Sequence, residues 1–238
     1  MLNYKKISIY LFFLATLFLG LYFQENSSGG AKIDFFYLYK NIENFSLSLE
    51  LGFSEFYKSK GNFVHSPVHY ILSGFLLNIF ENITIVKSLY LLVCSSIPII
   101  FYLILKNKYL IENDNIFYLS CIIFLSPFFR SSGIWLLGDN LSIIFFSLSV
   151  LFFNKTQFNN REFLNYYFCI FFLFLCCYVR YYYSLFFIFF FLSFYKKIPN
   201  RIFLNLLLES FILSIPIIIY FYNIIFNYSF FTLVESKI

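Results

Sequence analysis

Charged residues are scarce in this sequence: Asp, Glu, Lys and Arg make up 12% of its 238 residues, against about a quarter in a soluble globular domain. Tryptophan and methionine occur once each, and histidine twice. The basic residues stand in short clusters between apolar runs, and no basic tract is long enough to follow a phosphate backbone. This pattern argues against a water-soluble domain and against nucleic acid as a partner.

Several chemical signatures are also missing. The sequence contains no GxGxxG, GxxxxGK[ST], GxSxG or HExxH motif and no EF-hand loop, so nucleotide-driven enzymes and zinc hydrolases lose support. The five cysteines form no CxxC pair and have no histidine nearby. We therefore expect buried thiols rather than a metal site or a disulfide framework.

Apolar residues predominate in the sequence. They make up 61% of the chain, and the mean hydropathy is +0.77. A membrane-spanning helix needs about 20 apolar residues. The candidate runs lie at roughly 7–23, 86–105, 116–129, 141–153, 163–179, 182–195 and 203–226. The sequence thus predicts an all-α fold, a polytopic transmembrane helix bundle.

Three regions follow from these runs. Residues 1–23 are predicted to form a first transmembrane helix that stays as a signal anchor, because no small-residue cleavage site follows it. Residues 24–65 form an outer loop in which apolar and charged residues alternate, which is typical of interfacial helices. Residues 66–238 form the multi-span bundle, in which 66–80 is either a short re-entrant or interfacial helix or bends together with the next run.

Orientation follows from the basic clusters, since short cytoplasmic loops carry an excess of Lys and Arg. All the clusters fall on one side if residues 66–105 cross the membrane once. That side is predicted to be the cytoplasm, with the loop 24–65 and Asp139 outside. The clusters are Lys5/Lys6, Lys106/Lys108, Lys155/Arg161 and Lys196/Lys197/Arg201.

Asp34 is the first candidate for chemistry. It follows the flexible pair Gly29-Gly30 just after the first span, where the membrane meets water. A carboxylate at this boundary can act as a general base or bind a divalent metal. The plainer alternative is an acid that stabilises the N-terminal end of a helix.

Both histidines, His65 and His69, flank Pro67 at the start of the next apolar segment. Histidines at i and i+4 can share a ligand, but no third nitrogen or sulfur ligand is evident, which argues against zinc. They either cap a membrane helix or hydrogen-bond a polar substrate.

Three further charges border apolar runs. Arg130 and Asp139 lie in a turn that also holds Trp135, an expected interfacial anchor, and an acid at a span end is costly without a partner. Arg180 interrupts about thirty apolar residues, which form either one overlong span or two short ones. Its planar fork suits a phosphate better than a lysine would, although a plain hairpin charge is the alternative.

The layout of these residues resembles that of the GT-C type glycosyltransferases, a superfamily that includes the protein O-mannosyltransferases and the lipid A aminoarabinose transferases. The features are one N-terminal span, the early Asp34 in the first outer loop, the loop end His65-Ser66-Pro67-Val68-His69-Tyr70, and Gly138-Asp139-Asn140-Leu141 opening a later span. The resemblance covers roughly residues 1–155. Phe35 and Ser66 depart from the family pattern, and the chain is shorter than usual, as in a truncated or minimal member.

This resemblance implies a sugar donor carried on polyprenyl phosphate and an acceptor at the outer face of a bacterial cytoplasmic membrane. Asp34 would be the catalytic base or a carboxylate that positions the acceptor, and Asp139 would bind a divalent cation (Mg²⁺ or Mn²⁺) or the donor phosphate. His65 and Pro67 match the loop end of the family. In the resulting hypothesis the substrate-binding residues are His65, His69, Arg130 and Arg180, with Arg130 or Arg180 stabilising the departing lipid phosphate. Membrane lipids are the other expected partners, and the acceptor stays open. The rival hypotheses are a transporter or flippase for lipid-linked saccharides, and a non-catalytic membrane subunit.

Overall fold

A computed structural model describes residues 4–58, 66–109, 114–158, 163–195 and 197–227. The described residues are helical, with short turns between the helices and no strand. In chain order the helices are α1 (Tyr4–Tyr22), α2 (Ala31–Leu47), α3 (Leu49–Lys58), α4 (Val68–Phe80), α5 (Ile83–Cys94), α6 (Ile97–Tyr109), α7 (Asp114–Cys121), η2 (Ile122–Leu125), α8 (Pro127–Ile134), α9 (Gly138–Phe158), α10 (Leu164–Val179), η3 (Tyr181–Ser184), α11 (Leu185–Tyr195) and α12 (Asn200–Asn227). The all-α prediction is confirmed.

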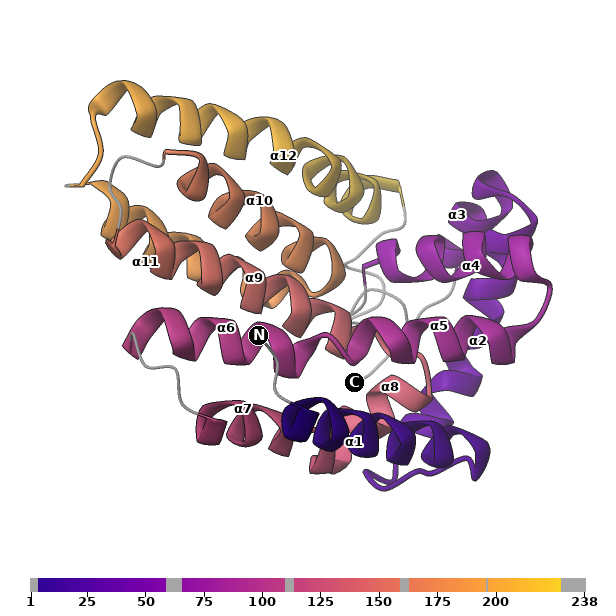
Figure 1. The fold of residues 1–238 in the computed structure, drawn as a ribbon. Helices are drawn as coiled ribbons and strands as arrows, with labels where there is room; N and C mark the ends of the chain where they lie inside the picture. The colour runs from indigo at the N-terminus through magenta and orange to yellow at the C-terminus, as the bar shows by residue number, and fades with distance from the viewer. Residues whose placement is uncertain (1–3, 59–65, 110–113, 159–162, 196, 228–238) are drawn as a thin grey trace, which may run out of the picture.

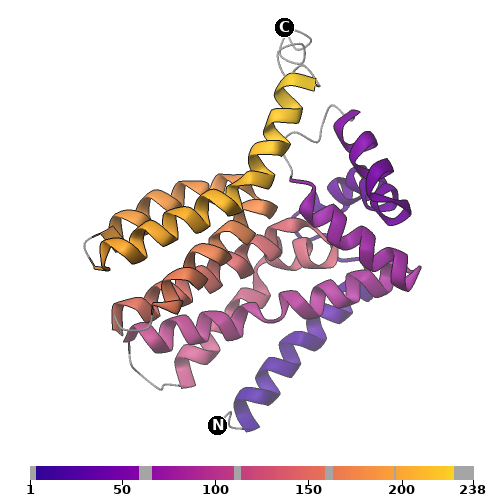
Figure 2. The ribbon, with the colours of Figure 1, turned by 90° about the horizontal axis from the view of Figure 1, so that it is seen from above.

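Among the described residues, three helices are long and apolar enough to cross a membrane, or four if one bent pair counts as a single span. The three are Tyr4–Tyr22, Ile83–Lys108, which joins α5 and α6, and Asn200–Tyr220. α1 and α12 lie on opposite sides of the bundle in both views (Figure 1 and Figure 2), and few of their side chains are buried. Such helices with apolar, outward-facing side chains indicate a membrane protein.

The run at 116–129 differs from its expected single span. It divides into α7 and η2, then bends by 64° into α8. The Ser126 side chain accepts a hydrogen bond from the Phe129 amide, and Pro127 occupies the first turn, where a missing N–H costs nothing. These signals start a new helix, so Arg130 lies within α8 and not in the turn that follows.

α2, α3 and α4 gather at one end of the bundle, on the right in Figure 1. α4 is a separate helix of 13 residues, too short to span, and it packs against α2. The ends of α6 and α9 that carry Lys106, Lys108 and Lys155 lie at the opposite end of the bundle. α2, α3 and α4 therefore lie apart from these basic helix ends, and the orientation of the chain in the membrane stays a prediction.

The orientation predicts that a cysteine replacing Asn107 is labelled by a membrane-impermeant reagent from the cytoplasmic side. The five native cysteines are buried, so their background should be low. A cysteine replacing the exposed Tyr37 on α2 serves as the outer control. Labelling of position 107 from outside would overturn the orientation.

Candidate functional site

Arg180 lies between two short apolar helices and forms an ion pair. Its backbone is extended (φ −140°, ψ 99°), which ends α10 and starts η3. Its Nε donates a hydrogen bond to Asp139 Oδ1 at 2.8 Å. The Arg180 side chain is 12% exposed and the Asp139 side chain 41%. The pair thus offers a mostly covered cation whose carboxylate partner still reaches solvent.

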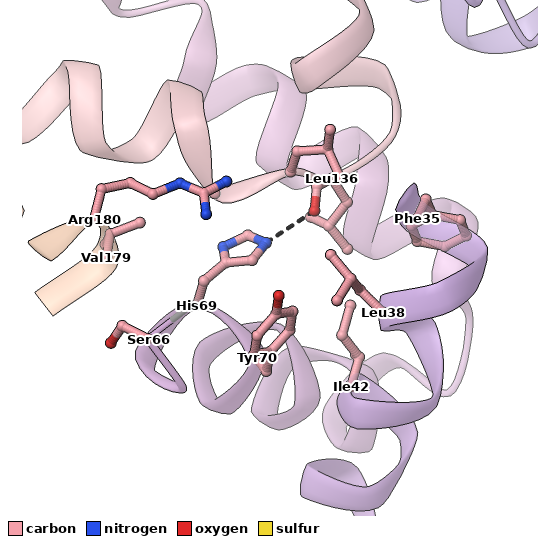
Figure 3. A pocket seen from close by; sticks show the side chains of 11 residues that line it. Phe35, Leu38, Ile42, Ser66, His69, Tyr70, Leu136, Val179 and Arg180 are labelled. Atoms are coloured by element: carbon pink, nitrogen blue, oxygen red, sulfur yellow. Dashed lines mark hydrogen bonds between the residues drawn. The ribbon is translucent and has the colours of Figure 1, made fainter. Parts of the chain in front are cut away.

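A small cavity of about 20 Å³, room for about one water molecule, adjoins this pair. Figure 3 shows Arg180 and His69 entering from one side, while Leu38 and Ile42 close the other. The Tyr70 hydroxyl points into the space between them. The site is therefore assembled from α2, α4, the start of α9 and the end of α10.

The backbone before α9 holds the cavity wall in place. His69 is buried, and its Nε2 lies 2.8 Å from the Leu136 carbonyl oxygen. Leu136 has a φ of 54°, a left-handed conformation that L-residues rarely adopt. A Cβ on Gly138 would lie 3.3 Å from His69 Cγ and 3.1 Å from a Val179 methyl carbon. Glycine at 138 allows α9 to start against His69, which brings Asp139 to Arg180.

Asp34 precedes, on α2, the residues of that helix that line the cavity. It lies one turn before Leu38 on the helix, and Leu38 and Ile42 line the cavity. Burial raises the pKa of the Tyr70 phenol, and the charges of Arg180, Asp139 and Asp34 all act on that hydroxyl. Asp34 is exposed. The structure therefore places Arg180, paired with Asp139, on the same small cavity as Tyr70, while Asp34 lies one helical turn before the cavity wall and does not line the cavity.

A larger apolar cavity of about 550 Å³ borders the small one. Ser66 lines both cavities, and Tyr178 and Tyr181, on either side of Arg180, line the larger one. Its other walls are apolar and aromatic side chains of α3, α4 and α12. Arg180 thus stands where a polar site meets an apolar cavity.

Arg130 does not line these cavities. Its Nε donates to Glu25 Oε1 at 2.7 Å, and its other nitrogens donate to the second Glu25 oxygen, to the Thr16 hydroxyl and carbonyl, and to the Phe124 carbonyl. Its donors join the end of α1 to η2 and α8. His65 lies outside the described residues.

A divalent cation at Asp139 would need oxygen ligands besides that one carboxylate. Within the described ranges, no group of three or more His, Cys, Asp or Glu side chains is placed to hold a metal ion. Asp34 and Asp139 offer two carboxylates, and Asp139 is already neutralised by Arg180. A Mg²⁺ bound here would depend on oxygen atoms of a substrate phosphate. The residues alone do not form a metal centre, and we assign no step to one.

Tyr70, which lines the small cavity, and Glu25, which pairs with Arg130, were not among the candidate residues from the sequence. Tyr70 directly follows His69, but its burial depends on α2 packing against α4. Glu25 lies just beyond the first apolar run, and its partner Arg130 is 105 residues away. The sequence did offer one signal for Glu25, because an acid at the end of a membrane span needs a cationic partner. Comparison of the chain with protein-family models, curated proteins and solved structures found no match.

Proposed function

We propose that the protein is a membrane glycosyltransferase of the GT-C type, which moves a sugar from a polyprenyl-phosphate donor to an acceptor at the outer face of a bacterial cytoplasmic membrane. One observation supports this function above all. Arg180, paired with Asp139, lines the same small cavity as Tyr70, and this cavity borders an apolar one of about 550 Å³ through Ser66. A lipid-linked, phosphate-bearing substrate needs apolar and charged surfaces side by side in this way.

The donor is proposed to bind across Arg180. Its polyprenyl chain lies in the larger cavity, whose walls come from α3, α4, α10 and α12. Its phosphate lies at the guanidinium, which can form parallel hydrogen bonds to two phosphate oxygens. Asp139 holds the Nε side of the guanidinium and so fixes the direction of the fork.

Asp34 is proposed as the general base. It takes the proton of the acceptor hydroxyl, and the hydroxyl oxygen forms a bond to the anomeric carbon of the sugar. The bond between that carbon and the phosphate oxygen breaks, and its electron pair leaves on the lipid phosphate. Arg180 stabilises this charge. A single displacement of this kind inverts the anomeric carbon.

The direct test is transfer from polyprenyl-phosphate sugars by the purified chain in reconstituted vesicles. Sugar transfer that depends on the donor is the expected result. If the unmutated chain transfers no sugar from any polyprenyl-phosphate donor, the proposed function is wrong. Movement of the donor across the bilayer in the same vesicles would then support the transporter hypothesis.

Arg180→Lys is expected to raise the KM for the donor about tenfold, which corresponds to about 1.4 kcal/mol. Lysine keeps the positive charge but loses the fork and the Nε contact with Asp139. The matched control is Arg201→Lys, the same change at an exposed arginine in the first turn of α12. An unchanged donor KM in the Arg180→Lys protein would remove the phosphate assignment.

A further inference from the structure

A third cavity, of about 580 Å³, lies between α1, α2, α5 and α8. Lys87 of α5 lines it, with its ammonium 3.7 Å from the centroid of the Phe35 ring and 4.3 Å from that of Trp135. The ammonium of Lys32 lies 5.4 Å from the Trp135 ring centroid. Two cations therefore flank one indole, which is itself 3% exposed.

In the part of the chain that the structure describes, neither lysine forms an ion pair with a carboxylate, and Lys32 Nζ donates only a long 3.5 Å hydrogen bond to the neutral Gln24 amide. The charge of Lys32 instead acts on Lys87. Of the nearby acids, Glu25 is paired with Arg130 and Glu43 is hydrogen-bonded to the Tyr39 hydroxyl, while Asp34, two residues after Lys32, forms no ion pair with either lysine among the described residues. Two like charges this close are costly without an anion.

The place of the cavity decides what kind of anion it suits. Its walls include the C-terminal end of α1 and the first two turns of α5, where two candidate spans reach one membrane boundary. Phe18, Leu21 and Ile83 give it an apolar wall, while Thr84 and Ser88 add hydroxyl groups beside Lys87. Lipid phosphates lie at this depth, with their acyl chains directly beneath.

We infer that this cavity binds the phosphate of an anionic membrane lipid, with Lys87 and Lys32 on the phosphate and the acyl chain against Phe18, Leu21 and Ile83. The site is separate from the one around Arg180, since Phe35 is the single residue that lines both cavities. It does not rest on the proposed glycosyl transfer. A phosphate ion free in solution has a similar charge but no acyl chain. Titrations with the lipid and with inorganic phosphate should therefore give different results.

The test uses the full chain, purified in a neutral detergent. Trp135 is the only tryptophan, so intrinsic fluorescence reports directly from the site. Short-chain phosphatidic acid is expected to change this fluorescence saturably, whereas phosphatidylcholine of the same chain length and inorganic phosphate at equal concentration are not. Equal binding of phosphatidylcholine would overturn the role of net charge, and equal binding of inorganic phosphate would overturn the lipid assignment.

Variants connect the signal to the lysines. Lys87→Met is expected to weaken binding of phosphatidic acid about tenfold or more, because a charge-assisted contact in a covered site is lost. Lys40→Met, at an exposed position on α2 outside the cavity, should bind as the unmutated chain does. Lys32 is more accessible than Lys87, so Lys32→Met is the test if the Lys87→Met protein fails to fold. It should weaken binding of phosphatidic acid about threefold or more. Affinity unchanged in the lysine variant tested would contradict the inference.

Discussion

Asp34→Asn is expected to lower sugar transfer by a factor of about 10² or more, the usual contribution of a positioned general base. Asparagine keeps the size of the side chain and most of its hydrogen bonds but cannot take the acceptor's proton. Asp34 is exposed on α2 and lies outside the candidate spans. Protein level and membrane insertion should therefore stay unchanged, and the loss should appear in kcat.

The matched control for this variant is Glu50→Gln. Glu50 is also an exposed acid in the first turn of an outer helix, α3. It should retain full activity, because it lies on α3, lines neither cavity, and is not among the charges that act on the Tyr70 hydroxyl, as Asp34 is. Full activity of the Asp34→Asn protein would reject the base assignment while leaving the donor site untouched.

Arg130→Met is expected to destabilise the protein by about 3–5 kcal/mol, the cost of breaking a buried ion pair by removing one partner. The Arg130 and Glu25 side chains are 14% and 26% exposed. The change leaves the Glu25 carboxylate and the Thr16 and Phe124 carbonyls without the donors they now share. Thermal unfolding in detergent measures the loss, and the double variant with Glu25→Gln should recover part of it.

The same ion pair makes stability depend on pH. The hydrogen bond from Arg130 holds the pKa of Glu25 below its ordinary value of 4.5. A carboxyl group whose pKa is lower in the folded state stabilises the fold above its ordinary pKa, and this contribution is lost as the pH falls through the folded value. The unmutated chain should lose stability in acid more steeply than the Arg130→Met protein. Equal melting temperatures, or equal acid sensitivity, would show that the pair is not structural.

The sequence predicted the helical class and the position of most helices because apolar runs of this length have few alternatives. The run at 7–23 corresponds to α1, and the suspected break at Arg180 separates α10 from η3 and α11. The run at 116–129 was harder to interpret, because composition alone does not show that a helix bends at Ser126 and Pro127. The local capping and proline signals there were stronger than the apolar pattern.

The sequence identified several residues of the candidate site but did not show which of them contact one another. Asp139 and Arg180 were each singled out, yet their 2.8 Å contact spans 41 residues and depends on α9 packing against α10. Arg130 was predicted to contact substrate, because the sequence does not show that it pairs with Glu25, which lies just after α1. Trp135 was expected to be an interfacial anchor, but it is buried, and its indole N–H donates to the Glu25 carbonyl at 2.8 Å. Such pairings are set by packing, which one sequence does not specify.

The shortness of the helices that meet at Arg180 has a consequence for the surrounding bilayer. α10 has 16 residues, which at a rise of about 1.5 Å per residue reach about 24 Å. The hydrocarbon core of a typical bilayer is about 30 Å thick. Lipids beside such a helix must thin to match it, at a cost of a fraction of a kcal/mol for each ångström of mismatch. If α10 crosses the membrane as the sequence predicts, headgroups and water are drawn toward Arg180, and the local membrane thickness then helps to set how the proposed donor phosphate reaches the guanidinium.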